Sequence, residues 1–178
     1  MYAPAALVAL MLSGCGAGPQ ASTATEVAVT SPSTAATATP TPTVMSVADA
    51  GKFYLTTVCP TNALGDKASA IMQTKPLDLG AAKSATAALR DGHRKVVETL
   101  SDPKVLWPDV VKADIVTLTD AIYGEVSGAD NVAKQTTESG LINAWNGWTS
   151  PPALASTAQK IRLKLGLAAD TSSSCSPN

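Results

Sequence analysis

Aromatic and charged residues are both scarce in this chain of 178 residues. It contains three Trp, three Tyr and one Phe, and its 13 basic and 14 acidic side chains nearly cancel. A nucleic-acid-binding domain would show a basic excess, and a charged tail would show a block of like charges. Neither is present, so no nucleic-acid partner is expected.

Metal ligands and catalytic motifs are scarce as well. The chain has three Cys and a single histidine, His93, without the close spacing of a zinc ligand set. No Gly-x-Ser-x-Gly motif of a serine hydrolase occurs. After the N-terminal region, no apolar run approaches the 20 or so residues that a membrane-spanning helix needs. We therefore expect no metal, no cofactor and no membrane-spanning segment.

The N-terminal region does contain a short apolar run, from residue 5 to residue 12, followed by Ser13-Gly14-Cys15. Its length fits the h-region of a signal peptide, and small residues suit the cleavage position. Leu12-Ser13-Gly14-Cys15 resembles the lipobox of bacterial lipoproteins, whose cysteine is acylated after cleavage. The resemblance implies that residues 1–14 are a lipoprotein signal peptide. Acylated Cys15 would then anchor the chain to the extracytoplasmic face of the cell membrane.

One element of a signal peptide is missing. No Lys or Arg precedes the apolar run, and no charge of either sign occurs before Glu26. Because signal peptides normally begin with a basic segment, we expect such a segment upstream of Met1. The alternative is a disordered cytosolic N-terminus in which Cys15 occurs by chance.

Residues 15–45 are predicted to form a lipid-anchored, disordered linker. Nearly all of residues 16–44 are Gly, Ala, Pro, Ser or Thr. The exceptions are Gln20, Glu26, Val27, Val29 and Val44. Such a segment buries too little apolar surface to offset its ordering entropy, and it would span roughly 30 Å on average. The remaining residues, 46–178, are assigned to one domain.

The domain is predicted to be all-α, a bundle of four to five helices, because apolar residues recur at helical spacing and no strand alternation occurs. Ser46 to Asp49 form a capping box that begins the first helix, which Pro60 should kink or split. The second helix spans about 78–100. The third begins at Pro108 and is closed by Gly128.

Two further helices follow in this prediction. The fourth spans about 130–148, and the fifth begins after Pro151-Pro152 and is capped by Gly166. The clearest apolar stripe lies on the third helix and consists of Val111, Ile115, Leu118 and Ile122. That stripe should face the core of the bundle.

Cys59 and Cys175 remain once Cys15 is lipidated. In an exported chain such a pair predicts a disulfide, and two free buried thiols are the alternative. A bridge would close a long loop, contribute roughly 4–5 kcal/mol in the chain-entropy account, and hold the polar C-terminal tail on the first helix.

Two segments, YLTTVCPTN at 54–62 and KIRLKLGLAADT at 160–171 followed by Cys175, resemble small exported lipoproteins of actinobacteria and their temperate phages. The likeness includes the lipobox and the Thr/Pro-rich linker. It implies a secreted helical domain with a Cys59–Cys175 bridge. It implies no reaction.

Two sets of titratable residues could carry chemistry. His93 lies on or beside the apolar face of the second helix, and we interpret it as a packed or partly exposed side chain rather than a general base. The third helix carries carboxylates, which could act in pairs in acid–base or glycosidic chemistry. These are Asp109, Asp114, Asp120 and Glu125. Because they fall largely off the apolar stripe, we interpret them as a solvated face.

A small basic patch of Arg90, Arg94 and Lys95 adjoins His93. It could hold a phosphate or a lipid headgroup, although we prefer to interpret it as a solvated helix face balanced by Asp91 and Glu98. Asn143, Trp145, Asn146 and Trp148 form a candidate ligand or partner surface, because tryptophans flanked by amides can stack on sugars or anchor a protein. The alternative is that both tryptophans belong to the core, and Trp107 is expected to fill one end of the bundle.

These observations favour a non-enzymatic binding or interaction module, anchored at the cell envelope, whose partner is an envelope protein or a glycan. A prophage-encoded superinfection-exclusion lipoprotein that blocks phage DNA entry or a receptor is the alternative. An envelope hydrolase that uses His93 and the carboxylates of the third helix is a third hypothesis.

Overall fold

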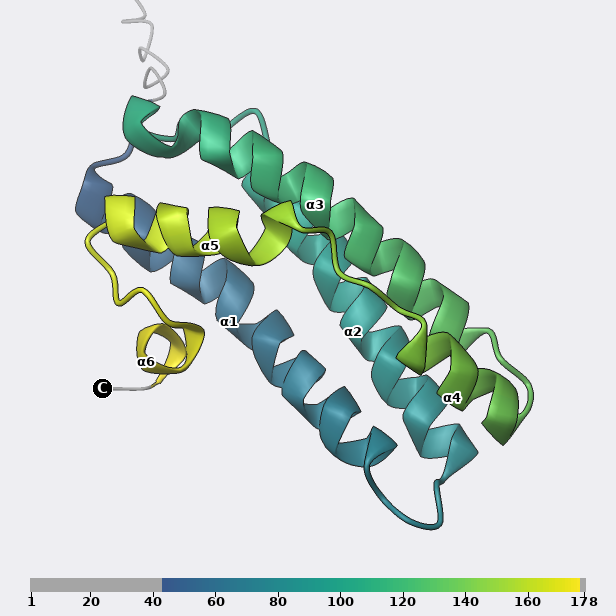
Figure 1. Cartoon of the computed structure of the whole chain (residues 1–178). Coiled ribbons are helices and arrows are strands. Elements are labelled where there is room, and N and C mark those ends of the chain that lie inside the picture. Colours follow the sequence, from purple (N-terminus) through teal and green to yellow (C-terminus); the bar gives the residue numbers. More distant parts are fainter. Residues whose placement is uncertain (1–42, 177–178) are drawn as a thin grey trace, which may run out of the picture. The chain divides into compact units, whose positions relative to one another are not determined.

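The computed structural model describes residues 43–176, which form six α-helices and no strand (Figure 1). The helices are α1 (Val47–Met72), α2 (Leu79–Leu100), α3 (Asp109–Ala133), α4 (Glu138–Asn146), α5 (Ala153–Lys164) and α6 (Thr171–Cys175). The prediction of an all-α fold is confirmed. The predicted number of helices was too low, because it did not include the short α6.

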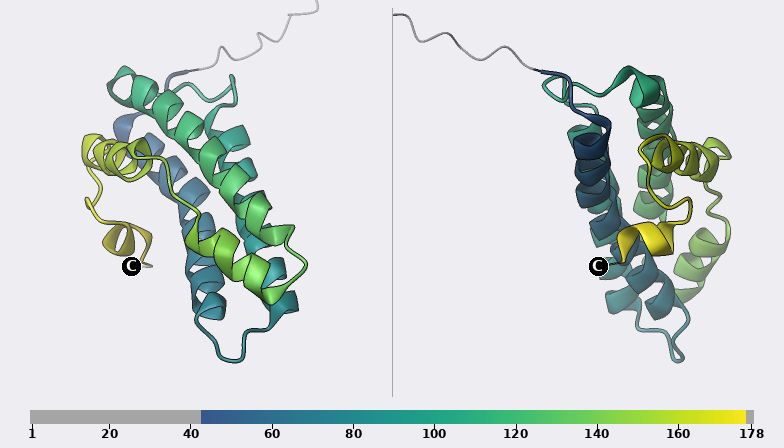
Figure 2. Two further views of the ribbon diagram at one scale, coloured as in Figure 1. Left: turned by 45° about the vertical axis from the view of Figure 1, so that its right-hand side comes forward. Right: turned by 90° about the vertical axis from the view of Figure 1, so that its left-hand side faces the viewer.

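Each of the three long helices runs antiparallel to the one before it, and α2 packs against both α1 and α3 (Figure 1). Helix α5 covers the side that α1 and α3 leave open, whereas α4 packs against the C-terminal end of α3. In both views of Figure 2, α6 lies beside the middle of α1. The three long helices therefore form the frame against which the shorter helices pack.

Helix α1 begins as predicted. The Ser46 hydroxyl accepts a hydrogen bond from the Asp49 backbone N–H at 3.1 Å, which caps the first turn. Pro60 was predicted to kink or split this helix, and the split does not occur, because α1 passes through Pro60 without a break. Val58 and Thr61, on either side of the proline, are both buried. Packing on both sides of Pro60 therefore outweighs the local cost of the lost hydrogen bond.

The boundary between the third and fourth helices was also predicted wrongly. Gly128 does not close α3, which continues to Ala133, and α4 begins only at Glu138. Thr137 caps α4 by accepting a hydrogen bond from the Gly140 N–H at 3.1 Å. The glycine at 128 serves packing instead, because a Cβ there would lie 2.2 Å from Nε1 of Trp148.

Most of the core lies between α1, α2, α3 and α5. The predicted stripe of α3 is confirmed, since each of its four members is at most 5% exposed. They are Val111, Ile115, Leu118 and Ile122. Tyr54 of α1, Leu100 of α2 and Ile161 of α5 pack in the same cluster. The core is thus shared by four helices of the bundle.

Helix α5 ends at the predicted glycine. Gly166 has a φ of +72°, and the Leu167 N–H donates to the Arg162 carbonyl at 2.9 Å, as in a Schellman motif. This turn reverses the chain and leads it to α6. There Cys175 forms the predicted disulfide with Cys59 of α1, with a Cα–Cα distance of 5.4 Å.

Candidate functional site

Helix α6 is joined to α1 by the disulfide and is stabilised internally by its own cap. The carboxylate of Asp170 accepts hydrogen bonds from the backbone of Ser173 at 2.7 Å and the hydroxyl of Ser172 at 2.8 Å. These hydrogen bonds lower the pKa of Asp170 to about 2. The Asn62 amide donates to Sγ of Cys175 at 3.5 Å. The short helix thereby covers one side of a hollow in the bundle.

Two hollows adjoin each other here, which we call the inner pocket and the outer cleft. The inner pocket, of about 230 Å³, lies between α1, α2, α3, α5 and the start of α6. The outer cleft, of about 660 Å³, lies beside the disulfide. Four residues line both hollows. They are Thr61, Asn62, His93 and Thr171.

A buried guanidinium lines the inner pocket. Arg162 of α5 is only 7% exposed, and its Nε donates to the Ala169 carbonyl at 2.9 Å. It also interacts with the phenol of Tyr54, which is 1% exposed. Burial raises the pKa of Tyr54 to about 12, although the nearby guanidinium opposes this rise. At neutral pH the pocket therefore contains a cation and an uncharged phenol.

His93 lies where the inner pocket meets the outer cleft. Burial lowers its pKa to about 4, so its imidazole is neutral at physiological pH. Its Nδ1 is buried and has no hydrogen-bond partner within residues 43–176. A buried nitrogen without a partner is costly, and a bound ligand could supply the missing partner. The prediction of a partly packed histidine agrees with this position.

The outer cleft contains the second buried group without a full set of partners. Glu125 of α3 lines the cleft and is 6% exposed. Its Oε1 has no hydrogen-bond partner among the described residues. Burial raises the pKa of Glu125, while a hydrogen bond with Ser150 opposes the rise. His93 and Glu125, from different helices, thus line the same cleft.

The interpretation of the α3 carboxylates as a solvated face is therefore wrong in part. Asp109 and Asp120 are exposed, as expected, but Asp114 and Glu125 are buried. Asp114 pairs with Lys160 and Lys164 of α5, each at 2.7 Å. Both lysines hold its pKa below the ordinary value. Because α5 packs on this side of α3, positions outside the apolar stripe become buried.

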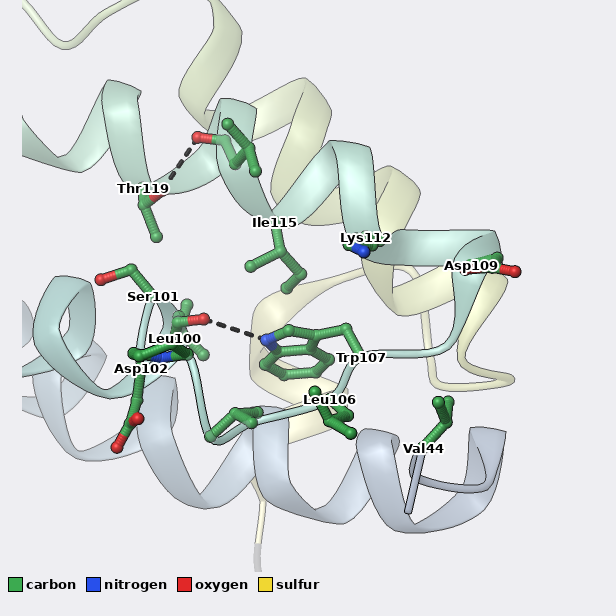
Figure 3. Close-up of a pocket in the computed structure, with 13 residues that line it drawn as sticks. Val44, Leu100, Ser101, Asp102, Leu106, Trp107, Asp109, Lys112, Ile115 and Thr119 are labelled. Carbon is green, nitrogen blue, oxygen red and sulfur yellow. Dashed lines mark hydrogen bonds between the residues drawn. The ribbon is translucent and has the colours of Figure 1, made fainter. Parts of the chain in front are cut away.

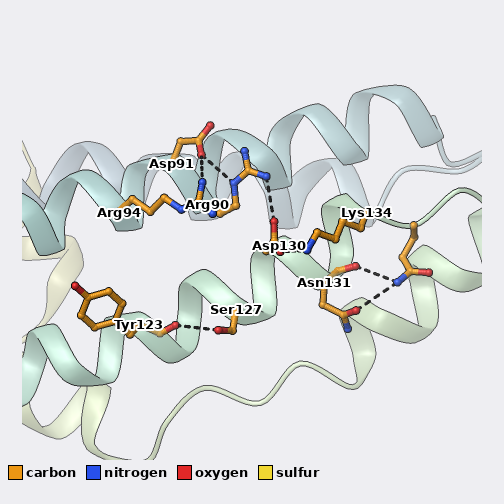
Figure 4. Close-up of polar contacts among 9 residues, drawn as sticks. Arg90, Asp91, Arg94, Tyr123, Ser127, Asp130, Asn131 and Lys134 are labelled. Carbon is orange, nitrogen blue, oxygen red and sulfur yellow. Dashed lines mark hydrogen bonds and ion pairs between the residues drawn. The ribbon is translucent and has the colours of Figure 1, made fainter.

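The predicted basic patch is largely neutralised. Arg90 lies between Asp91, at 2.9 Å, and Asp130, at 3.3 Å (Figure 4). Arg94 approaches the same oxygen of Asp91 at 3.4 Å. Asp130 also pairs with Lys134, one turn further along α3. Two of the three cations thus have acidic partners, which favours the solvated-face interpretation over an anion site.

The predicted Asn/Trp surface is divided between core and solvent. Trp145 and Trp148 are partly buried and form an edge-to-face pair with ring centroids 5.7 Å apart. Both pack against the core cluster that contains Leu141. Asn143 and Asn146 are exposed. The two amides therefore do not flank an open aromatic face, and the core interpretation explains the tryptophans better.

A third hollow, of about 330 Å³, lies at the end of the bundle where the described residues begin (Figure 3). Trp107 lies in this pocket, and its Nε1 donates to the Leu100 carbonyl at 2.9 Å. Its indole also packs edge-to-face on Phe53, with ring centroids 5.6 Å apart. The prediction that Trp107 fills a bundle end is confirmed. Because its N–H already has a partner, this end pocket offers less to a ligand than the inner pocket.

Sequence reasoning missed Arg162 and Tyr54 as parts of one site. A signal was present for Arg162, which lies four residues after Ala158 and eight after Leu154, on the side of α5 that faces the bundle. Because Arg162 stands between Lys160 and Lys164 at the C-terminal end of α5, the local sequence is equally well explained by solvated cations that suit the helix dipole. No local signal places Tyr54 beside it, since the two residues are on different helices.

The N-terminal predictions, including the acylated Cys15, lie outside the described residues. Within residues 43–176, no helix has the length and apolar character needed to cross a membrane. In the same range no three Cys, His, Asp or Glu side chains gather in a way that could hold a metal ion. No family model, curated protein or solved structure matches this chain.

Proposed function

We propose that this chain is an extracytoplasmic lipoprotein whose helical domain binds a small ligand without transforming it. The observation that carries the proposal is the inner pocket, in which the buried Arg162 lies among mainly apolar walls. Concave sites with apolar walls and a few converging polar groups are typical of small-molecule binding. The pocket is formed by helices of the core, so it is largely preformed.

Binding without chemistry is supported by the state of the reactive groups. A general base works best when its pKa lies near the operating pH, and burial lowers the pKa of His93 to about 4. The two described cysteines, Cys59 and Cys175, are joined to each other and offer no free thiol. These side chains favour a receptor for a ligand over an acid–base or thiol enzyme.

Export and anchoring are supported by two independent features. The lipobox-like segment ends at Cys15, and the disulfide between Cys59 and Cys175 is a bond that persists in oxidising, extracytoplasmic compartments. An anchored domain works at a high local concentration near the envelope, so modest affinity for a ligand suffices.

Membrane fractionation tests the anchor. The parent chain should be recovered with the membrane and should incorporate a labelled fatty acid, whereas Cys15→Ser should do neither. Cys59→Ser, which removes a different cysteine, is the matched control and should remain in the membrane fraction. Unchanged membrane recovery of the Cys15→Ser chain would refute the anchoring proposal.

Native mass spectrometry tests the pocket. Chain purified from its source membranes should carry an additional small mass that is released on denaturation. Ala158 lines the inner pocket, so Ala158→Phe should fill it and abolish the additional mass. The binding proposal is rejected if parent and variant both carry no additional mass, or if both carry the same one.

A further inference from the structure

The charge of Arg162 lacks a counter-ion in the described part of the chain. Its guanidinium is buried, yet no ion pair among residues 43–176 includes it. The neighbouring Lys160 and Lys164 share Asp114 instead. A buried charge without an opposite charge is destabilising. An anionic ligand would therefore bind favourably here, because it would supply the counter-ion that Arg162 lacks.

The lining of the inner pocket favours an anion with an apolar body. No Asp or Glu is among the residues that line it. Its polar groups include three that can donate hydrogen bonds, from Tyr54, Thr61 and Asn62. The rest of the lining is largely aliphatic and includes Leu118 and Ile122. The pocket thus combines a cation and hydrogen-bond donors with an aliphatic lining.

Size and charge narrow the class of ligand. A volume of about 230 Å³ corresponds to about eight water molecules at about 30 Å³ each, which is enough for a short aliphatic chain with a polar head. One cation balances one negative charge, whereas a phosphate near its dianionic state would leave excess charge in a buried site. The outer cleft contains the carboxylates of Asp66 and Glu125, which disfavour a second negative charge at the far end.

We propose that the inner pocket binds an aliphatic monocarboxylate, with the carboxylate on the guanidinium of Arg162 and the chain along Leu118 and Ile122. Arginine is suited to this role, since its planar fork can hold a carboxylate through two parallel hydrogen bonds. A longer chain would continue past His93 into the outer cleft. This inference rests on the proposed binding function and specifies its ligand.

Calorimetric titration of the full-length Cys15→Ser chain tests the inference, in buffer without detergent and with the disulfide oxidised. Hexanoate is the probe, and 1-hexanol and hexylammonium are comparators with the same chain length. Hexanoate should bind with a stoichiometry of one, at least about tenfold more tightly than either comparator, because only it can pair with the guanidinium. Hexyl phosphate should bind more weakly than hexanoate.

Three variants locate the site. Arg162→Met should weaken hexanoate binding by about tenfold or more, and Arg162→Lys should retain part of it. Arg94→Met, which removes an exposed cation of α2, should leave it unchanged. If Arg162→Met fails to fold, Ala158→Phe together with the comparators in the parent chain provides the same test.

Two results would overturn the monocarboxylate assignment. The first is equal affinity for hexanoate and 1-hexanol, and the second is tighter binding of hexyl phosphate. Unchanged hexanoate affinity in Arg162→Met or in Ala158→Phe would overturn the assignment to the inner pocket. The proposed function is tested separately, because the anchor is measured by fractionation and a bound molecule of any chemistry by native mass spectrometry.

Discussion

The indole of Trp148 lies directly on Gly128 of α3. A Cβ at position 128 would lie 2.2 Å from Nε1 and 2.4 Å from Cδ1 of this ring, where no side chain fits. One turn earlier, a Cβ at Gly124 would lie 2.6 Å from the ring of Pro151. The two glycines therefore form a shallow groove on α3 that receives the connection between α4 and α5.

Gly128→Ala should destabilise the domain by about 1–3 kcal/mol. Alanine in a helix interior normally stabilises by up to about 1 kcal/mol relative to glycine. Here the methyl group would displace the indole, and the packing of Trp148 against Leu141 and its neighbours would be lost. Urea denaturation followed by tryptophan fluorescence measures the change.

Gly65→Ala is the matched control, because a Cβ at position 65 of α1 meets only Cδ1 of Leu89 at an ordinary 3.8 Å. That variant should be neutral or stabilised. In a Trp148→Ala background, Gly128→Ala should likewise cease to destabilise, because the clash has been removed. Equal effects of the alanine at positions 65 and 128 would show that the contact does not control stability.

Much of the fold could be predicted from local pattern, because apolar spacing and caps are local properties. The stripe of α3, the cap at Ser46 and the stop at Gly166 all depend on residues within one or two turns. Gly128 could not be interpreted in this way. Its role depends on a tryptophan that reaches it from beyond α4, and a glycine near a predicted helix end resembles a cap.

The same limit applies to Pro60 and to the candidate site. Local propensity predicts a break at proline. Val58 and Thr61 of α1 are buried in the folded domain, and this tertiary packing keeps α1 continuous. The site requires contact between Tyr54 of α1 and Arg162 of α5, which are far apart in the sequence. Among such long-range contacts, only the Cys59–Cys175 pair could be predicted, because disulfide pairing follows from the number of cysteines and the expected compartment.

Loss of the disulfide should release α6 before the rest of the domain unfolds. Cys175→Ser removes the constraint between residues separated by 116 positions, which is worth up to about 4–5 kcal/mol in the chain-entropy account. Because α6 packs chiefly on α1, its detachment should expose the segment after Gly166 to proteases while α1 to α3 stay protected. Limited proteolysis with mass spectrometry detects this pattern.

The control for that experiment is Asp170→Ala, which removes the cap of α6 and keeps the bridge. It should weaken the first turn of α6 and leave the C-terminal segment protected by the disulfide. Intact mass should also show the parent chain two hydrogens lighter than its reduced form. Equal protease sensitivity of the parent and Cys175→Ser would contradict the proposed role of the bridge.

Mild acid should destabilise the domain through His93. Burial lowers the pKa of this imidazole from 6.5 to about 4, so the unfolded chain takes up the proton near pH 6.5 and the folded chain only near pH 4. The contribution of the neutral His93 imidazole to stability is therefore fully present above about pH 6.5. The contribution of His93 should fall as the pH drops from about 6.5 to about 4, by about 3 kcal/mol at most, and it is measured as the difference between the parent and His93→Gln because Glu125 acts in the opposite direction in this range. His93→Gln should flatten this part of the profile.

Urea denaturation at several pH values between 4.5 and 7.5 measures the effect. The carboxylates whose pKa is lowered, such as Asp114 and Asp170, lose their contribution only below about pH 4, outside this window. A profile of equal slope in the parent and in His93→Gln would show that the imidazole is not the group responsible.

Glu125→Gln should stabilise the domain at neutral pH. Burial raises the pKa of this carboxyl above 4.5, and its Oε1 has no partner among the described residues, so the ionised form is disfavoured in the folded state. A group with a raised pKa favours folding below its unfolded pKa, and this contribution is lost as the pH rises through its folded pKa. The neutral amide avoids that loss. A gain of about 1 kcal/mol is therefore expected at pH 7.5, and it should shrink as the pH falls toward 4.5.

Asp120→Asn, which changes an exposed carboxylate on the same helix, is the control and should change stability by less than about 0.5 kcal/mol at either pH. If Glu125→Gln instead destabilises the domain at pH 7.5, the hydrogen bond with Ser150 or another partner compensates the burial of the carboxylate, and the assignment of an unpartnered Oε1 in the outer cleft is wrong.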